Sequence, residues 1–241
     1  MKHALARDSA ARGAGWLAVC AGAEERDCFI RLGLGNVTIS NLDERLIGDE
    51  FAPYSWSRQN AQSLSFADNA FDYAFVSDGL HHCSSPHAAL LQMYRVAKKA
   101  IVVVESRDSA AVRLAERLGL AERYEVDAVI GNSFAFGGVN NTAVPNFVYR
   151  WTERELEKTI LSFNPTGPHE FRFFYALNLP ERGPRAARAL LRAAKPVAAL
   201  AGRILRRQCN SFAMIAYKPD GVWPWLGREG DGVAFRREFA G

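Results

Sequence analysis

Residues 60–83, with the sequence NAQSLSFADNAFDYAFVSDGLHHC, constrain the fold of this chain more than any other stretch. A turn at Asp68-Asn69-Ala70 precedes the apolar run Tyr73–Val76, and a polar break at Ser77-Asp78-Gly79 follows it. This pattern predicts a short buried strand whose polar end opens toward a helix. In open α/β sheets, ligands bind beside the carboxyl ends of the strands. We therefore expect a ligand site at the end of this strand.

The segments on either side continue the alternation of strand and helix. Residues 16–20 and 36–40 are apolar runs of strand length, and a helical pattern between them is closed by Gly33 and Gly35. Residues 16–43 thus form one βαβ unit. After the central stretch, residues 86–97 predict an amphipathic helix with Pro86 in its first turn, and 100–105 is a continuous apolar strand typical of a doubly covered parallel sheet.

The outer parts of the chain give weaker signals. Residues 4–14 predict a short helix, 44–59 a polar connection, and 108–120 a helix. A long irregular stretch at 131–141 is rich in Gly and Asn, which is uncommon unless a loop is functional. Thr152 and Glu155 form a capping box that opens a helix at 153–163. Residues 169–177 and 210–218 predict two further strands.

Composition bounds the class of protein. At 241 residues, 49% of them hydrophobic and 23% charged, the chain suits one globular domain spanning 1–241. We see neither a signal peptide nor an apolar run long enough to cross a membrane, and expect a cytoplasmic protein. Its cysteines have no metal-binding or disulfide-framework spacing, so reduced thiols and no metal are predicted; they are Cys20, Cys28, Cys83 and Cys209.

Basic charge gathers in one segment. Residues 181–207 carry eight Lys or Arg and one Glu, a net charge of +7, so the rest of the chain sums to −3 against a total of +4. This asymmetry argues against a nucleic-acid partner bound along the whole chain. Two interpretations remain open for the segment: a solvated helix face covering the sheet, or a face that contacts an anionic substrate or a membrane surface.

The order and spacing of these motifs resemble the class I S-adenosylmethionine-dependent methyltransferases of the small-molecule, type 11-like group. The resemblance covers residues 16–105 well and the rest in outline. It implies an α/β, doubly wound, Rossmann-like fold with a seven-stranded, mostly parallel sheet and an antiparallel last strand. Helical insertions would form a cap: a lid at 106–151 and a basic helical insertion at 178–208.

The resemblance also implies the cofactor, S-adenosylmethionine, with S-adenosylhomocysteine as product. The positions that match the cofactor site are Cys20, Ala21, Gly22, Asn41, Leu42, Asn60, Ala61, Gln62 and Ser77. Several depart from the family pattern. The first turn keeps only Gly22 of its glycines, and Asn41 and Asn60 stand where carboxylates are usual. An amide still hydrogen-bonds, but each bond loses about 1 kcal/mol of charge-assisted strength. Cofactor affinity is therefore expected to be weakened; the alternative is a fold that has lost its cofactor.

Candidate catalytic residues follow the central strand. The candidates are His82, His81 and Asp78, which lie beside the expected position of the reacting sulfonium of such an enzyme, and His suits a general base near neutral pH. Each has a structural alternative, because a His there can pack against a helix start and Asp78 can cap it. Candidate substrate residues in the lid region are Phe136, Asn140, Tyr149 and Arg150, for which ordinary packing is the alternative.

The sequence thus predicts methyl transfer to a small-molecule, sugar- or lipid-linked acceptor, with oxygen favoured as the accepting atom. The alternative is a methyltransferase-like protein without methyl transfer, acting as a repurposed enzyme, scaffold or partner subunit. The expected partner is a small acceptor with anionic groups, and no nucleic acid; peripheral membrane contact would run through 181–207. The tail, with Trp223, Trp225 and Phe235, either packs back or mediates a homodimer.

Overall fold

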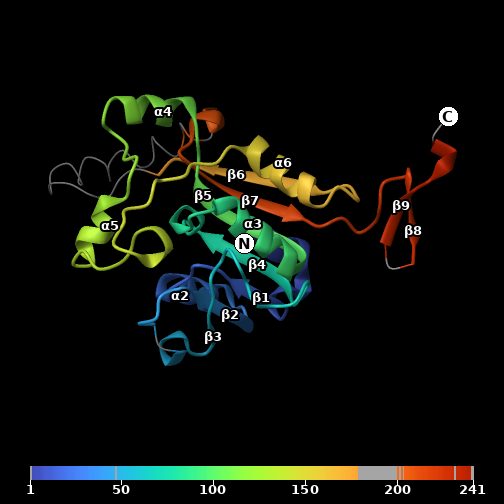
Figure 1. Ribbon diagram of the computed structural model, residues 1–241, viewed down its shortest axis with the longest axis horizontal. Helices are drawn as coiled ribbons and strands as arrows, with labels where there is room; N and C mark the ends of the chain where they lie inside the picture. The colour runs from blue at the N-terminus through green and yellow to red at the C-terminus, as the bar shows by residue number, and fades with distance from the viewer. Residues whose placement is uncertain are drawn as a thin grey trace.

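The computed structural model describes residues 2–46, 48–178, 200, 202, 204–230 and 232–239. Within these residues the chain forms an open α/β sheet with helices on both faces (Figure 1). Most of the predicted basic insertion, 178–208, lies outside the described residues, and so do the basic positions of its proposed helix. Both interpretations of that segment therefore stay predictions.

Seven strands of the described chain make up the main sheet, in the order β3-β2-β1-β4-β5-β7-β6. Strands β1 to β5 run parallel to one another, whereas β7 is antiparallel to both β5 and β6. The mostly parallel sheet with an antiparallel last strand is confirmed. The bounds are β1 Gly15–Ala18, β2 Asn36–Asn41, β3 Ser55–Arg58, β4 Phe71–Ser77, β5 Ala97–Ser106, β6 Glu170–Ala176 and β7 Ser211–Tyr217.

Alternate residues of the central strands enter two separate cores, one on each face of the sheet. On the first face, Leu17, Ala74 and Ile101 pack with side chains of helices α3 (Pro86–Val96) and α6 (Glu153–Phe163). On the other, Trp16 and Tyr73 stack with ring centroids 4.4 Å apart and pack with α1 (Lys2–Arg7) and α2 (Ala23–Leu32). Burial on both faces explains why the central strands read as continuous apolar runs.

Local sequence signals place several helix ends. Helix α6 begins where the capping box predicts, because Thr152 Oγ1 accepts from the amide of Glu155 while the Glu155 carboxylate accepts from the amide of Thr152. Helix α3 has Ser85 as its N-cap and Pro86 in its first turn. Helix α2 ends at Gly33, whose φ of 68° lies in the left-handed region that glycine tolerates best.

Three predictions of local structure were wrong. The connection 44–59 contains the edge strand β3, whose sequence Ser-Trp-Ser-Arg lacks an apolar run because only part of it is buried. The predicted helix at 4–14 divides at Asp8, which caps a short 3-10 turn at Ser9–Arg12. In the lid region, a short helix α5 (Val126–Gly131) precedes the irregular stretch, and α4 covers only Ala110–Arg117.

The tail forms a small hairpin, β8 (Leu226–Glu229) and β9 (Gly232–Phe235), which extends away from the main sheet (Figure 1). Its base packs back on the domain: the indole of Trp223 donates to the Pro165 carbonyl at 3.0 Å and stacks on Trp225. No helix of the described chain has the length and hydropathy needed to cross a membrane.

Candidate active site

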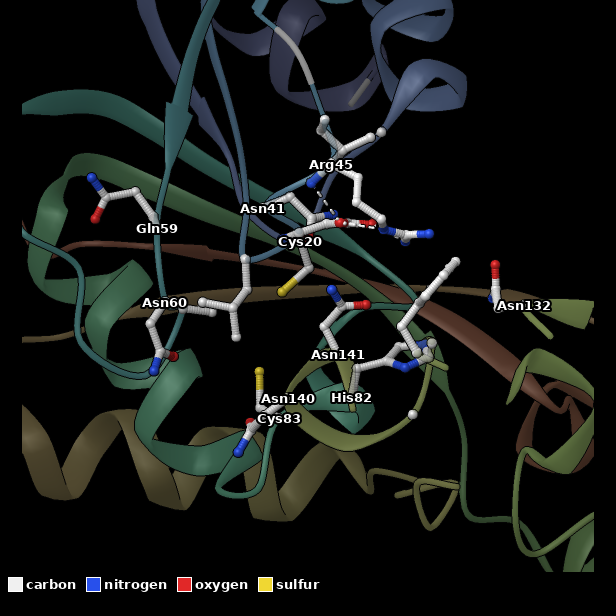
Figure 2. A pocket seen from close by; sticks show the side chains of 18 of the residues that line it. Cys20, Asn41, Arg45, Gln59, Asn60, His82, Cys83, Asn132, Asn140 and Asn141 are labelled. Atoms are coloured by element: carbon white, nitrogen blue, oxygen red, sulfur yellow. Dashed lines mark hydrogen bonds and ion pairs between the residues drawn. The ribbon is translucent and has the colours of Figure 1, made fainter. Parts of the chain in front are cut away.

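A pocket of about 410 Å³ lies at the carboxyl ends of β1, β2 and β4 (Figure 2). This is where an open α/β sheet binds its ligands, and the volume is in the range of small-molecule sites. The lid region contributes one wall. The lining residues are Cys20, Gly22, Asn41, Leu42, Asp43, Arg45, Leu46, Gln59, Asn60, Ala61, Asp78, His82, Cys83, Asn132, Phe136, Gly137, Gly138, Asn140 and Asn141.

The turn after β1 approaches the turn after β4 very closely. Cys20 has a φ of 53°, unusual for a residue with a side chain, and a Cβ added at Gly79 would lie 2.6 Å from the Cys20 Cβ. Only glycine fits at position 79. A hydrogen bond to Cys83, together with burial, raises the pKa of the Cys20 thiol well above its usual value. Cys20 is therefore a neutral thiol in the pocket wall.

At the end of β2, two polar side chains share the place where a single acid was expected. Asn41 donates to the Ala21 carbonyl at 3.2 Å and accepts from the amide of Asp43 at 3.1 Å. Hydrogen bonding by Arg45 holds the pKa of the Asp43 carboxyl below its usual range. The Arg45 guanidinium also lies over the ring of Phe136. Asp43 thus supplies a pocket carboxylate two residues beyond Asn41.

Gln62 joins the loop after β3 to the lid region. Its Nε2 donates to Asn140 Oδ1 at 2.9 Å, and its Oε1 accepts from the amide of Ser85 at 2.7 Å. Asn60, which lines the pocket, accepts from the amide of Gln62 at 3.0 Å. The structure therefore places Asn60 at the pocket and gives Gln62 a supporting position behind it.

Glu105, at the end of β5, is fully buried and organises the turn after β4. One carboxylate oxygen accepts from the amides of Gly79 and Leu80 at 2.9 and 2.7 Å. The other oxygen lies 3.1 Å from His81 Nδ1. A buried carboxylate with this many donors is well compensated, and it fixes both the turn and the ring orientation of His81.

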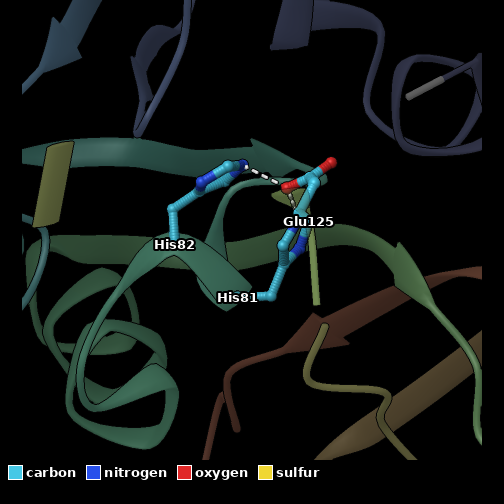
Figure 3. Close-up of side chains that lie close together, drawn as sticks. All are labelled: His81, His82 and Glu125. Atoms are coloured by element: carbon cyan, nitrogen blue, oxygen red, sulfur yellow. Dashed lines mark ion pairs between the residues drawn. The ribbon is translucent and has the colours of Figure 1, made fainter. Parts of the chain in front are cut away.

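His81, His82 and Glu125 meet at the edge of this region (Figure 3). Glu125 Oε2 lies 3.4 Å from His81 Nε2 and 3.3 Å from His82 Nε2. Burial opposes protonation of His81, but hydrogen bonds to Glu105 and Glu125 outweigh it and raise the His81 pKa to about 10. His81 hydrogen bonding, opposed by burial, lowers the Glu125 pKa to about 2. Without a bound cation, His81 is therefore an imidazolium between two carboxylates.

His82 and Asp78 are the titratable groups that line the pocket itself. Burial and the adjacent charge of His81 lower the pKa of His82, so its ring is neutral at pH 7. Asp78 has a φ of 44° and reaches solvent through the pocket. Enclosure by the surrounding protein, followed by the negative charge of Glu105, raises the Asp78 pKa to about 6. Two acceptors of protons thus face the pocket at neutral pH.

Several sequence-predicted site residues lie away from the pocket lining. Ala21 is buried, Ser77 ends β4 behind the lining residues, and His81 is turned toward Glu105. In the lid region, the Tyr149 hydroxyl donates to the Glu155 carboxylate. Arg150 pairs with Glu116 and donates to the Glu122 carbonyl at 2.7 Å. Phe136 and Asn140 line the pocket, whereas Tyr149 and Arg150 brace the lid against the helices beside it.

Sequence reasoning missed the acids that orient the histidines. Glu105 gave a usable signal, since a lone acid that ends a continuous apolar strand must find donors at the ligand edge of the sheet. Glu125 gave none, because its approach to His81 depends on how residues 106–151 fold back. Asp43 lies two residues beyond Asn41 in the sequence, and its position in the pocket comes from the structure.

The donor set of the pocket fits the adenosine portion of S-adenosylmethionine. Six amide side chains line it, and amides donate and accept hydrogen bonds as hydroxyls and ring nitrogens require; they are Asn41, Gln59, Asn60, Asn132, Asn140 and Asn141. The carboxylate of Asp43 supplies a charged acceptor beside Asn41. The turns after β1 and β4 approach each other closely at Cys20 and Gly79, and together they contribute Cys20, Asp78 and His82 to the pocket lining.

Comparison with known proteins gives a consistent result. Residues 18–104 match a family model described as a methyltransferase domain, Methyltransf_11, which is the stretch in which the sequence resemblance is strongest. A search of curated protein sequences finds no match.

Among solved structures, the chain is similar to one from the complex between the Haloferax volcanii Trm112 methyltransferase activator and a methyltransferase. The identity is 14%, the TM-score 0.56, and 90% of this chain and 88% of that one are covered. It is also similar to magnesium protoporphyrin IX methyltransferase from Synechocystis PCC 6803 with bound S-adenosylhomocysteine, with 13% identity, a TM-score of 0.52 and coverage of 90% and 79%. A third, the [4+2]-cyclase SpnF, shows 16% identity, a TM-score of 0.54 and coverage of 91% and 80%. At these identities the likeness shows the fold alone.

Proposed function

We propose that this chain, a class I S-adenosylmethionine-dependent methyltransferase, transfers the methyl group of its cofactor to an oxygen atom of a small acceptor. The observation that carries the proposal is one pocket at the ends of β1, β2 and β4, where the cofactor-binding candidates and two proton acceptors converge. The family match over residues 18–104 supports the enzyme class and its cofactor.

The pocket residues divide into holding and reacting groups. We assign the adenosine portion to Asn41, Asp43 and Asn60, whose amide and carboxylate oxygens accept from hydroxyl and amine groups. The turn at Cys20 and Gly22 takes the cofactor along its backbone at the start of helix α2, where the Gly22 amide donates to the Glu25 carboxylate at 2.8 Å. Leu42 and Ala61 supply the apolar wall of this part of the pocket.

S-adenosylmethionine supplies a methyl group activated by positively charged sulfur. For an in-line displacement the protein must align the acceptor and exclude water, and a hydroxyl acceptor must lose its proton. We assign that proton to Asp78 or His82, which face the pocket and accept protons at pH 7. Phe136, held over Arg45, and Asn140 close the pocket from the lid.

We propose a small, sugar- or lipid-linked acceptor rather than a nucleic acid. The described pocket contains a single cationic side chain, Arg45, and this guanidinium already pairs with Asp43. A phosphate backbone would need several free Lys or Arg residues at the pocket mouth. Binding of an anionic acceptor through 181–207 remains a prediction from the sequence.

Calorimetry tests the proposal directly. S-adenosylmethionine and S-adenosylhomocysteine are titrated into the full chain, and each should bind with a stoichiometry of one. Asp43→Asn is expected to weaken both by about tenfold, because it removes the charge of a pocket acceptor. The matched control Asp108→Asn, at an exposed ion pair with Arg113, should leave both affinities unchanged. Absence of binding at millimolar cofactor would overturn the assignment.

The second candidate is a methyltransferase-like protein that performs another reaction or none. It is favoured by the neutral side chains Asn41 and Asn60 and by the similarity of this fold to a protein described as a [4+2]-cyclase. The two candidates differ in product formation. A methyltransferase converts bound cofactor to S-adenosylhomocysteine in the presence of an acceptor library, whereas this alternative binds cofactor without consuming it, or binds none.

A further inference from the structure

We propose that His81, His82 and Glu125 form a binding site for one divalent transition-metal ion at the wall of the pocket (Figure 3). The three residues have no metal-binding spacing in the sequence, since Glu125 lies more than forty residues from the histidine pair. The fold brings the three together, because the lid region returns Glu125 to the end of β4.

The three ligand atoms converge at metal-binding distances. Glu125 Oε2 lies 3.4 Å from His81 Nε2 and 3.3 Å from His82 Nε2, and all three atoms lie within 4.8 Å of one another. Bonds from Zn²⁺ to nitrogen and oxygen of about 2.1 Å, at a tetrahedral angle, separate two ligand atoms by about 3.4 Å. The observed ligand edges to Glu125 therefore match those of a small divalent ion.

Groups behind the ligands hold them in the orientation that metal binding needs. His81 Nδ1 lies 3.1 Å from the buried carboxylate of Glu105, which directs Nε2 toward Glu125. Asn146, itself buried, donates to Glu125 Oε2 at 3.3 Å, and its carbonyl accepts from the Glu125 amide at 3.0 Å. Carboxylate–histidine–metal arrangements with a second donor on the ligating acid are the usual outer shell of metal sites.

A second histidine–carboxylate pair elsewhere in the chain has no third metal-binding side chain beside it among the described residues. His87 Nε2 lies 3.0 Å from the Glu155 carboxylate, but that carboxylate also accepts from Tyr149 and caps helix α6. In the described chain, only His81, His82 and Glu125 place three metal-binding side chains around one point. Two imidazoles and one carboxylate suit zinc, iron, cobalt or nickel, whereas magnesium and calcium prefer all-oxygen sites.

The metal site would also have a role in catalysis, and this role rests on the proposed methyl transfer. His82 lines the pocket, and three protein ligands leave a position open for an oxygen atom of the acceptor. A hydroxyl bound to the ion loses its proton more readily. Asp78, which also lines the pocket, would take that proton, because His82 Nε2 would be occupied by the ion. The oxygen would then bond to the methyl carbon while the carbon–sulfur bond breaks, with that bond's electron pair staying on sulfur. The acceptor would coordinate the ion through one hydroxyl oxygen or through two neighbouring oxygen atoms.

Cobalt binding tests the site without any turnover. The full chain, stripped of metal with a chelator and dialysed, is titrated with Co²⁺ and followed by its visible absorption, and with Zn²⁺ by calorimetry. One equivalent of Co²⁺ should bind, and its visible absorption should be that of four-coordinate cobalt. Glu125→Gln and His82→Gln, which preserve size, should each weaken binding at least tenfold, with circular dichroism confirming that they fold.

His87→Gln serves as the matched control, since it removes a partly exposed histidine beside a glutamate and should leave cobalt affinity unchanged. Absence of a one-equivalent complex would overturn the metal site. The site would also be overturned if Glu125→Gln left cobalt affinity unchanged, or if His87→Gln lowered it as much as Glu125→Gln does. The ion would then be bound by other histidines. In either case the three residues are an ion-paired clasp between lid and sheet.

Calorimetry with S-adenosylhomocysteine on the metal-free chain separates the two proposals. Cobalt binding without S-adenosylhomocysteine binding would remove the proposed function and keep the metal site. The reverse result would keep methyl transfer and remove the metal.

Discussion

Glu105 and His81 are joined by a buried contact, 3.1 Å between carboxylate and Nδ1, that links the ends of two neighbouring parallel strands. The same carboxylate holds the amides of Gly79 and Leu80. A single side chain thus fixes the turn that carries Asp78, His81 and His82.

We expect Glu105→Gln to lower the free energy of unfolding by about 3 kcal/mol, because it removes a buried charge and leaves its donors poorly paired. Urea unfolding with a chelator present measures this without any contribution from bound metal. Glu44→Gln is the control: Glu44 is 71% exposed in its pair with Arg58, and its loss should change stability by less than about 0.5 kcal/mol. Equal effects of the two substitutions would contradict the role of Glu105.

Asn60→Asp is expected to tighten binding of S-adenosylhomocysteine by about five- to tenfold, because a carboxylate accepts a stronger, charge-assisted bond than an amide. The substituted oxygen can keep the bond from the Gln62 amide. Asn69→Asp is the control, since Asn69 lies in the turn before β4 and contacts Lys218 outside the pocket. Calorimetry that finds no gain at position 60 would place the cofactor elsewhere.

The raised pKa of Asp78 gives a pH-dependent prediction. Because the folded pKa is about 6 against 3.8 for a free carboxyl, the folded protein holds this proton more tightly, and the stabilising contribution is lost as pH rises through 6. Relative to the native chain, Asp78→Asn should gain stability between pH 4 and pH 7. Thermal unfolding at both values measures the difference, and a pH-independent offset would show that titration of Asp78 plays no part.

The same group should appear in the rate. If Asp78 accepts the acceptor's proton, kcat/KM rises through about pH 6 as Asp78 ionises, and Asp78→Asn removes that limb. Asp68→Asn, at an exposed pair with Arg95, is the matched control and should preserve the profile. If kcat/KM of Asp78→Asn still rises through about pH 6, the group whose ionisation causes the rise is His82.

Gly79→Ala is expected to destabilise the fold by about 1–3 kcal/mol and to weaken cofactor binding, since its Cβ would lie 2.6 Å from the Cβ of Cys20 and force the two turns apart. Gly221→Ala provides the comparison, because no described atom lies within 4 Å of a Cβ at that position. Urea unfolding and calorimetry with S-adenosylhomocysteine measure both effects. If Gly79→Ala changed neither stability nor S-adenosylhomocysteine affinity, the turn after β1 would be able to shift without cost.

Local signals were sufficient for most of the fold. The capping box at Thr152 and Glu155 predicted the start of α6, and the continuous run 100–105 predicted the core of β5, because each depends on neighbouring residues alone. Strand β3 was not predicted because it is a short edge strand that needs little apolar surface.

The candidate site was predictable to a lesser degree. Residues at or just after strand ends, such as Asn41, Asn60 and Asp78, reach the pocket because the sheet topology places those ends together. Glu125, Tyr149 and Arg150 belong to the lid region, where the partner of each side chain depends on how an irregular segment folds back. Their positions follow from tertiary contacts that no local pattern records.

The insertion of β7 between β5 and β6 has a consequence for synthesis on the ribosome. Strand β5 ends at residue 106, but its outer neighbour begins at residue 211, and β6 has no place in the described sheet until β7 arrives. Until then an apolar edge of β5 is open to pairing with other chains. A nascent chain halted before residue 211 would therefore leave the β5 edge unpaired, so about a hundred residues beyond β5 must be synthesised before that edge is covered.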